Sequence, residues 1–251
     1  MITLKKLQDK VEKRISDYME FDIKDLFEVS DYITIYGGAV RDSLADLEIH
    51  DVDILCMPDS ARKLRIFLNT KGYTTLELYD VDSLHMYKGI SLISEPWTLM
   101  NKNRKIIQII RPTFGGPNMT TTTSEMEYQL SYYNLIKNVD LSCCGVFLEN
   151  FGDTIKLREA CETAIVQCLS KTYIVNDWAK LYNRNRTDFR EYKLDSRGWK
   201  NFRSDKNTQL KRERQMKLIN LEFKPEYDYK IWTEAEYLNR PKKSKYDDLP
   251  F

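Results

Sequence analysis

Apolar residues recur every three or four positions at the start of the chain, with charged residues between them. Leu4, Leu7, Val11, Ile15 and Tyr18 follow this spacing. They would share one face of an α-helix, while the intervening lysines, arginine and acids would cover the other face. The pattern predicts an amphipathic helix packed on the core, and its dispersed charges do not fit a signal peptide.

The next stretch changes from a strand pattern to a turn, a helix and a second strand. Residues 31–36 are mostly β-branched and aromatic, which favours a buried strand. Gly37 and Gly38 allow a sharp turn into a helix over residues 39–46. Residues 51–55 then alternate between acidic and apolar side chains, which predicts a strand with one polar face.

This second strand carries the first candidate chemistry. Because successive side chains of a strand point to opposite faces, Asp51 and Asp53 would lie together on one face. Two neighbouring carboxylates repel each other unless a cation lies between them, and Mg²⁺ prefers oxygen ligands together with substrate phosphates. Gly37 and Gly38 open the preceding helix, whose free N–H groups favour a phosphate. The stretch therefore predicts a phosphate-binding turn beside a metal site.

The later elements follow no regular alternation of strand and helix. Asp59 can cap a helix over 60–70 that ends at Gly72, and a capping-box pattern opens a helix at residue 124. The further predicted strands are 74–78, 90–93, 104–110, 139–148 and 154–157, and the further helices are 124–137, 160–170, 176–183 and 187–194. This order predicts a mixed α/β fold of the α+β type, with a small twisted sheet flanked by helices and a helical C-terminal part.

Composition is that of an ordinary globular protein. Of the 251 residues 42% are hydrophobic and 31% charged, and no apolar run approaches the roughly 20 residues that a membrane span needs. The five cysteines lack paired metal spacing, which favours a reducing, cytoplasmic location. Cys161 and Cys168 are one heptad apart and are expected to share the core face of one helix.

Charge is distributed unevenly along the chain. Residues 184–217 contain 12 Lys or Arg and 5 Asp or Glu, a net charge of +7, whereas the whole chain carries +1. A basic segment of this kind favours an anionic partner, such as RNA or a triphosphate. A solvated helical face is the alternative interpretation.

The central motif resembles that of a known family. Gly-Gly-x-Val-Arg-Asp at 37–42, followed by Asp-x-Asp at 51–53, is similar to the nucleotidyltransferases of the DNA polymerase β superfamily, and in particular to the head domain of poly(A) polymerases and CCA-adding enzymes. That family has a third metal-binding carboxylate on a later strand, for which Asp140 is the candidate. Tyr192, Arg197, Gly198 and Trp199 resemble the Lys-Tyr-x-x-Arg-Gly-Phe helix end of some viral relatives.

The resemblance implies a catalytic domain over 1–158 and a mainly helical, acceptor-binding region over 159–251. It implies template-independent transfer of a nucleoside monophosphate from a nucleoside triphosphate, ATP among them, to an RNA 3′ end, with two metal ions at the site and release of pyrophosphate. The residues that it assigns to Mg²⁺, or to Mn²⁺ in its place, are Asp51, Asp53 and Asp140. Those that it assigns to the nucleotide are Gly37, Gly38, Arg41, Tyr192 and Arg197, while Asp42 would fix the helix or pair with an arginine.

Two departures from the family bear on the substrate. The Glu-Asp-x-x-Arg segment that reads the incoming base in bacterial CCA-adding enzymes is absent, as is a clear Arg-Arg-Asp-Phe-Thr-Ile-Asn stretch. CCA addition itself is therefore not expected. Two other functions stay open: a nucleotidyltransferase that modifies a protein or a small nucleotide in defence or toxin chemistry, and a catalytically idle relative that binds RNA.

Overall fold

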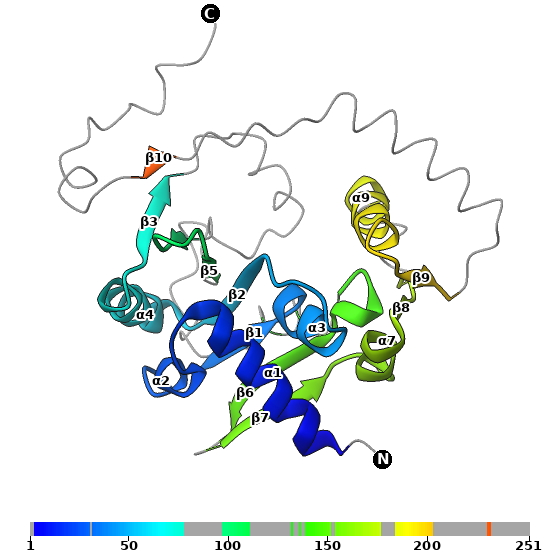
Figure 1. Ribbon diagram of the computed structural model, residues 1–251, viewed down its shortest axis with the longest axis horizontal. Coiled ribbons are helices and arrows are strands. Elements are labelled where there is room, and N and C mark those ends of the chain that lie inside the picture. The colour runs from blue at the N-terminus through cyan, green and yellow to red at the C-terminus, as the bar shows by residue number, and fades with distance from the viewer. Residues whose placement is uncertain are drawn as a thin grey trace, which may run out of the picture.

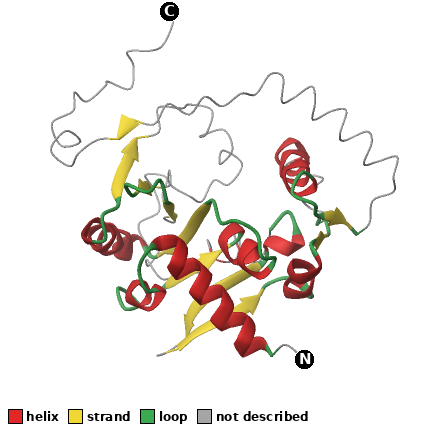
Figure 2. Ribbon diagram, in the orientation of Figure 1, coloured by secondary structure: helices red, strands yellow, loops and turns green. Residues whose placement is uncertain are grey.

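A mixed sheet with helices packed against it forms the centre of the protein in the computed structural model (Figure 1). The structure describes residues 3–30, 32–77, 97–110, 132, 136, 139–151, 154–176, 184–202 and 230–231. Figure 2 distinguishes the helices from the strands of the sheet in these parts of the chain.

The sheet has eight strands within the described residues. Their order across the sheet is β10 (Lys230–Ile231), β3 (Thr74–Glu77), β4 (Trp97–Met100), β5 (Ile106–Ile110), β2 (Asp51–Cys56), β1 (Ile33–Tyr36), β6 (Val146–Phe151) and β7 (Thr154–Glu159). Neighbouring strands are antiparallel except β2 and β5, which run parallel. This arrangement confirms the predicted fold class, a mixed sheet flanked by helices.

Several helices accompany the sheet in the described part of the chain. They are α1 (Leu4–Met19), α2 (Ile23–Phe27), α3 (Gly38–Leu44), α4 (Pro58–Thr70), α7 (Ala164–Ser170), α9 (Arg184–Asp195) and the 3-10 helix η2 (Ser142–Cys144). A second, parallel pair of short strands joins β8 (Thr172–Tyr173) to β9 (Lys200–Asn201). No helix of the described residues is long and apolar enough to cross a membrane.

The two faces of the sheet differ. Ile35 of β1 and Val52 and Ile54 of β2 are fully buried in the main core, to which residues of α1 and α3 contribute. On the other face, Leu55 and Ile110 belong to a smaller apolar cluster. The acidic side chains of β2 therefore lie on the face opposite the main core.

Strong periodic patterns were predicted correctly. Helix α1 begins after Thr3, whose side chain caps it by accepting from the Lys6 N–H, and its predicted apolar face is buried from Leu7 onward. Gly72 and Gly198 follow α4 and α9 with φ of +85° and +83°, the left-handed conformation that glycine adopts most easily.

Two local predictions are wrong. Asp59 does not cap α4, because the helix already begins at Pro58 with Met57 at the N-cap position. The strand predicted over 139–148 is interrupted: Asp140 lies in a bend, η2 follows, and β6 begins only at Val146. The hydroxyl of Ser142 accepts the Ile174 N–H at 2.9 Å, a side-chain bond that competes with extension of the strand.

The region after β7 also differs from prediction. Helix α7 begins at Ala164, not at residue 160, so Cys161 precedes it and does not share a helical face with buried Cys168. Strand β4 was not predicted at all. The predicted strand 90–93 and the larger part of the predicted helices 124–137 and 176–183 lie outside the described residues. The domain boundary at residue 158 stays a prediction.

Candidate functional site

Asp51 and Asp53, called the acid pair below, lie where the alternation predicted them. Both belong to β2 and are half-buried, while Val52 and Ile54 between and after them are fully buried on the opposite face. The two carboxylates therefore share one face of the sheet, near the end of β2 that follows the loop from α3.

The Gly-Gly turn brings backbone next to this acid pair. Gly37 has φ +71° and ψ −124°, and its N–H donates to the carbonyl of Val146 at 3.1 Å. A methyl group on Gly38 would lie 3.8 Å from Oδ1 of Asp51 and 3.9 Å from Nη2 of Arg41. Because Gly38 has no side chain, the space between a carboxylate and a guanidinium stays open.

Arg41 and Asp42 form a buried ion pair on α3. Nε and Nη2 of Arg41 donate to the two carboxylate oxygens of Asp42 at 2.7 and 2.9 Å, and both side chains are almost fully buried. Nη1 of Arg197 donates to Oδ2 of Asp42 at 2.8 Å, and its Nη2 donates to the Glu48 carbonyl at 3.0 Å. Asp42 thus pairs with two arginines, one of its predicted roles, and joins α3 to the segment after α9.

Asp140 has an arginine of its own. Its Oδ1 accepts from the Leu141 N–H at 2.9 Å and from Nη1 of Arg190 on α9. Within the described residues no three Asp, Glu, His or Cys side chains gather around a common point. The grouping of Asp140 with the acid pair around one metal stays a prediction.

Cys144 lies between two guanidinium groups. Its Sγ accepts from Nη1 of Arg41 at 3.3 Å and from Nη2 of Arg190 at 3.4 Å. A hydrogen bond from Cys143, together with the charges of Arg190 and Arg41, lowers the pKa of Cys144 to about 5, although burial opposes this shift. Burial raises the pKa of Cys143 instead, which keeps that thiol protonated as a donor.

These contacts link four of the predicted site residues. The connection runs from Asp51 past Gly38 to Arg41, then through Cys144 and Arg190 to Asp140. Sequence reasoning missed Cys144 and Arg190: a cysteine in an apolar run is typical of a core position, and Arg190 is one of many basic residues in its segment.

The C-terminal candidates differ in their contacts. Arg197 reaches Asp42, and the ring of Trp199 lies 5.6 Å from the guanidinium carbon of Arg41. Tyr192 lies half-buried on α9. Its contact with a nucleotide stays a prediction.

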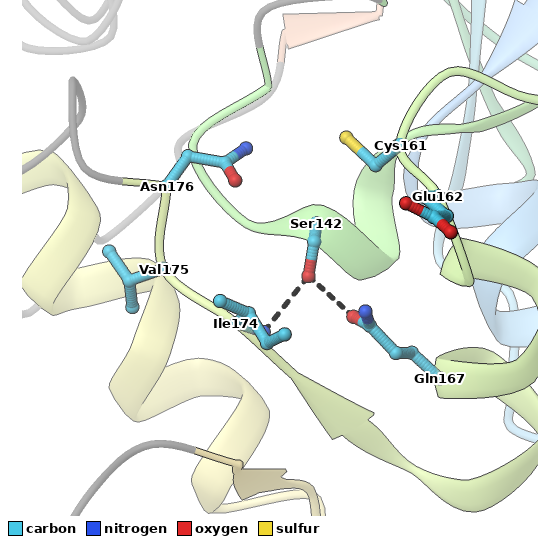
Figure 3. A pocket seen from close by; sticks show the side chains of 7 residues that line it. All are labelled: Ser142, Cys161, Glu162, Gln167, Ile174, Val175 and Asn176. Atoms are coloured by element: carbon cyan, nitrogen blue, oxygen red, sulfur yellow. Dashed lines mark hydrogen bonds between the residues drawn. The ribbon is translucent and has the colours of Figure 1, made fainter.

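A separate polar pocket lies beside η2 (Figure 3). Its lining residues are Ser142, Cys161, Glu162, Gln167, Ile174, Val175 and Asn176. The Asn176 N–H donates to the Asp140 carbonyl at 2.9 Å, which makes this wall a neighbour of Asp140. The pocket contains none of the residues predicted for the metal or the nucleotide.

The fold is similar to that of CCA-adding enzymes. One solved structure of a CCA-adding enzyme with CTP has a TM-score of 0.53 and 15% identity over 88% of this chain. A structure with ATP has a TM-score of 0.52 and 15% identity over 86% of the chain. The Thermotoga maritima CCA-adding enzyme complexed with tRNA has a TM-score of 0.52 and 14% identity over 83% of it.

This similarity confirms the resemblance of fold predicted from the Gly-Gly and Asp-x-Asp motifs. The chain spans just under half the length of these solved chains, 47%, 45% and 44% respectively. No protein-family model and no curated protein matches the sequence. At such low identity the CCA-adding enzymes establish the fold class alone.

Proposed function

We propose that the protein is a metal-dependent nucleotidyltransferase, which moves a nucleoside monophosphate from a nucleoside triphosphate to an RNA 3′ end and releases pyrophosphate. The observation that carries the proposal is the placement of Gly38 between the carboxylate of Asp51 and the guanidinium of Arg41. A divalent cation would bind to the acid pair, and phosphate oxygens would reach both the cation and Arg41 through the opening that Gly38 leaves.

The chemistry of the acid pair fits Mg²⁺. Asp51 and Asp53 are half-buried, share one face and offer the hard oxygen ligands that Mg²⁺ prefers together with phosphates. Asp51 and Asp53 would hold two Mg²⁺ ions, which would act as Lewis acids on the phosphoryl oxygens and together stabilise the attacking and the leaving oxygen. Removal of one carboxylate also relieves repulsion within the pair, so variants at these positions are expected to stay folded.

The arginines have separate roles in the proposal. Arg41 borders the opening at Gly38, where its Nη2 would hold the triphosphate in place while Asp42 fixes its orientation. Arg190 is held by Asp140 and Cys144, so we assign Asp140 to the site through Arg190 and leave the cation to the acid pair. Arg197 would hold α3 in position through Asp42.

An RNA acceptor has two independent supports. Residues 184–217 carry the net charge of +7, which attracts a polyanion more strongly than a small acceptor. The Thermotoga maritima CCA-adding enzyme, which has a similar fold, was solved in complex with tRNA. A protein or small-nucleotide acceptor and an idle RNA-binding protein are the competing outcomes of the experiment below.

The test is transfer of label from each α-labelled nucleoside triphosphate to total RNA, total protein or a small product, in the presence of Mg²⁺. The parent protein is expected to label RNA. The Asp51→Ala/Asp53→Ala variant is expected to lose transfer by at least about 10³-fold while unfolding at the temperature of the parent. Label in protein or in a small product would mean that this molecule, and not RNA, is the acceptor. Label in none of the three fractions would contradict the proposed activity.

A matched control tests whether the loss of transfer is specific to the acid pair or follows the removal of any two carboxylates. Asp17 and Asp46 are exposed and form ion pairs with lysines on the surface, so Asp17→Ala/Asp46→Ala removes the same number of carboxylates. This control is expected to keep full transfer. If it lost activity as completely as the acid-pair variant, the loss could not be assigned to metal binding.

A further inference from the structure

Strand β5 contains one polar residue among four isoleucines. Its sequence is Ile-Ile-Gln-Ile-Ile, and Gln108 is half-buried, whereas Ile107, Ile109 and Ile110 are fully buried. A half-buried amide at this position loses part of its hydration, whereas a further isoleucine would pack beside its neighbours without that loss. Glutamine at this position therefore indicates a polar neighbour, with which an isoleucine side chain could not interact.

The register of the sheet identifies the neighbour of Gln108. Strands β2 and β5 run parallel, and Gln108 is paired with Asp53. Paired residues of neighbouring strands point to the same face, with their backbones about 4.8 Å apart. Gln108 is thus the side chain next to Asp53 on the acidic face.

A polar row crosses the sheet at this level. Tyr36 of β1 is paired with Asp53, Asp53 with Gln108, and Gln108 with Thr98 of β4. Thr98 is 3% exposed, and its Oγ1 has no hydrogen-bond partner among the described residues. The rows on either side contain apolar partners, since Asp51 is paired with Ile106, and Leu55 with Ile110.

We infer that Gln108 is a further residue of the metal site, whose side-chain carbonyl oxygen takes the third protein position beside the carboxylates of Asp51 and Asp53. The inference deepens the proposed function and rests on it. An amide oxygen is a hard, neutral ligand, so the protein would offer the cation two negative charges where a third acid would give three. A site of lower charge holds its cation less tightly and relies more on the phosphates of the nucleotide.

The inference is tested by Mn²⁺ binding, measured by titration calorimetry without nucleotide. Gln108→Glu adds the third charge and is expected to tighten Mn²⁺ binding by about tenfold, because ligand charge sets affinity in oxygen sites. Gln108→Met keeps the length of the side chain without its oxygen and is expected to weaken binding by about tenfold. Thermal unfolding without metal shows that both variants fold.

A second pair of variants separates the inference from the proposed function. Asp53→Asn is expected to abolish Mn²⁺ binding, and Thr98→Val, which removes the neighbouring hydroxyl at constant shape, is expected to leave it within about twofold. If Asp53→Asn abolished binding while both Gln108 variants bound like the parent, Gln108 would lie outside the metal site and the inference would be overturned. If Asp53→Asn bound Mn²⁺ like the parent, the proposed function would fail and the inference with it.

Discussion

At the scale of single residues, the two adjacent glycines have different tasks. Gly37 has φ +71° and ψ −124°, a conformation that other residues adopt only with strain, whereas Gly38 lies in α3 and its position would accept a methyl group without steric conflict. We predict that Gly37→Ala lowers the free energy of unfolding by about 1–3 kcal/mol. Gly38→Ala should change it by less than about 1 kcal/mol and still reduce nucleotidyl transfer, because the methyl group fills the opening beside Asp51.

Urea denaturation and the labelling assay together decide between these roles. A Gly38→Ala variant with the transfer rate of the parent would remove the opening from the proposed mechanism. A Gly37→Ala variant as stable as the parent would instead mean that the backbone at residue 37 can relax.

Asp42 is a structural residue because its buried carboxylate pairs with two arginines. It is 3% exposed and receives hydrogen bonds from Arg41 and Arg197, so its loss removes the buried carboxylate that these two guanidinium groups share. We predict that Asp42→Asn lowers the free energy of unfolding by about 3–5 kcal/mol, measured by urea denaturation. Asp46→Asn, which removes an exposed partner of Lys10 and Arg14, should cost less than about 1 kcal/mol.

The lowered pKa of Cys144 predicts that the free energy of unfolding depends on pH. Its pKa is lowered from 9.0 to about 5 in the folded protein, so between these values the unfolded chain binds the extra proton. Stability from this group therefore increases as pH rises from about 5 to about 9, by at most about 1.4 kcal/mol per pH unit, and is lost as pH falls through about 5. Cys144→Ser should flatten this slope in urea denaturation at about pH 6 and about pH 8. If Cys144→Ser kept the pH dependence of the parent, a group other than Cys144 would be its cause.

At the scale of elements, α9 is held by charge more than by apolar packing. Among its described side chains Leu194 is the buried aliphatic one, and Arg190 and Arg197 connect the helix and its C-terminal end to Asp140 and Asp42. Helix α1 instead buries an apolar stripe from Leu7 to Met19. The attachment of α9 therefore depends on a few specific side-chain contacts, whereas that of α1 is spread over a continuous buried stripe.

This difference predicts local opening of α9. In Arg190→Ala/Arg197→Ala, amide hydrogen exchange of α9 should become at least about tenfold faster, while exchange in α1 stays at the rate of the parent. Lys5→Ala/Lys13→Ala removes two exposed lysines from α1 and serves as the charge-matched control. Equal acceleration in both helices would indicate global destabilisation and contradict independent attachment of α9.

Elements with a strong period could be predicted from sequence, and elements set by distant partners could not. The stripe of α1 and the alternation of β2 are local patterns, so both were found. The stretch 139–148 is apolar enough for a strand, but Ser142 bonds to residues 167 and 174, which no local pattern reveals. Strand β4 pairs with β3 and β5, and its four residues are too few to show a strand pattern by themselves.

The same limit applies to the candidate site. Asp51, Asp53 and the two glycines belong to short motifs and could be named without a structure. Gln108 becomes a neighbour of Asp53 only through the parallel register of β2 and β5, across more than fifty residues of sequence. Arg190 could not be chosen among the basic residues around it until its contacts with Asp140 and Cys144 were known.

At the scale of the whole molecule, the proposed site exists only when the sheet is assembled. Its residues come from α3, β2 and β5, and Arg41 of α3 connects it through Cys144 to Arg190 of α9. An unfolded chain has no such arrangement, so metal and nucleotide should bind the folded state alone. Binding of this kind stabilises the fold by an amount set by the ligand concentration relative to its dissociation constant.

We therefore predict that Mg²⁺ and a nucleoside triphosphate together, each at 100 times its dissociation constant, raise the free energy of unfolding by at least about 2.7 kcal/mol in urea denaturation. The triphosphate without Mg²⁺ should give a much smaller increase, because the acid pair repels its phosphates when no cation lies between them. Asp53→Asn should lose the cooperative part of the increase, and Asp46→Asn should keep it. An increase of the same size without Mg²⁺ would show that the arginines alone bind the nucleotide, and the acid pair would then need another role.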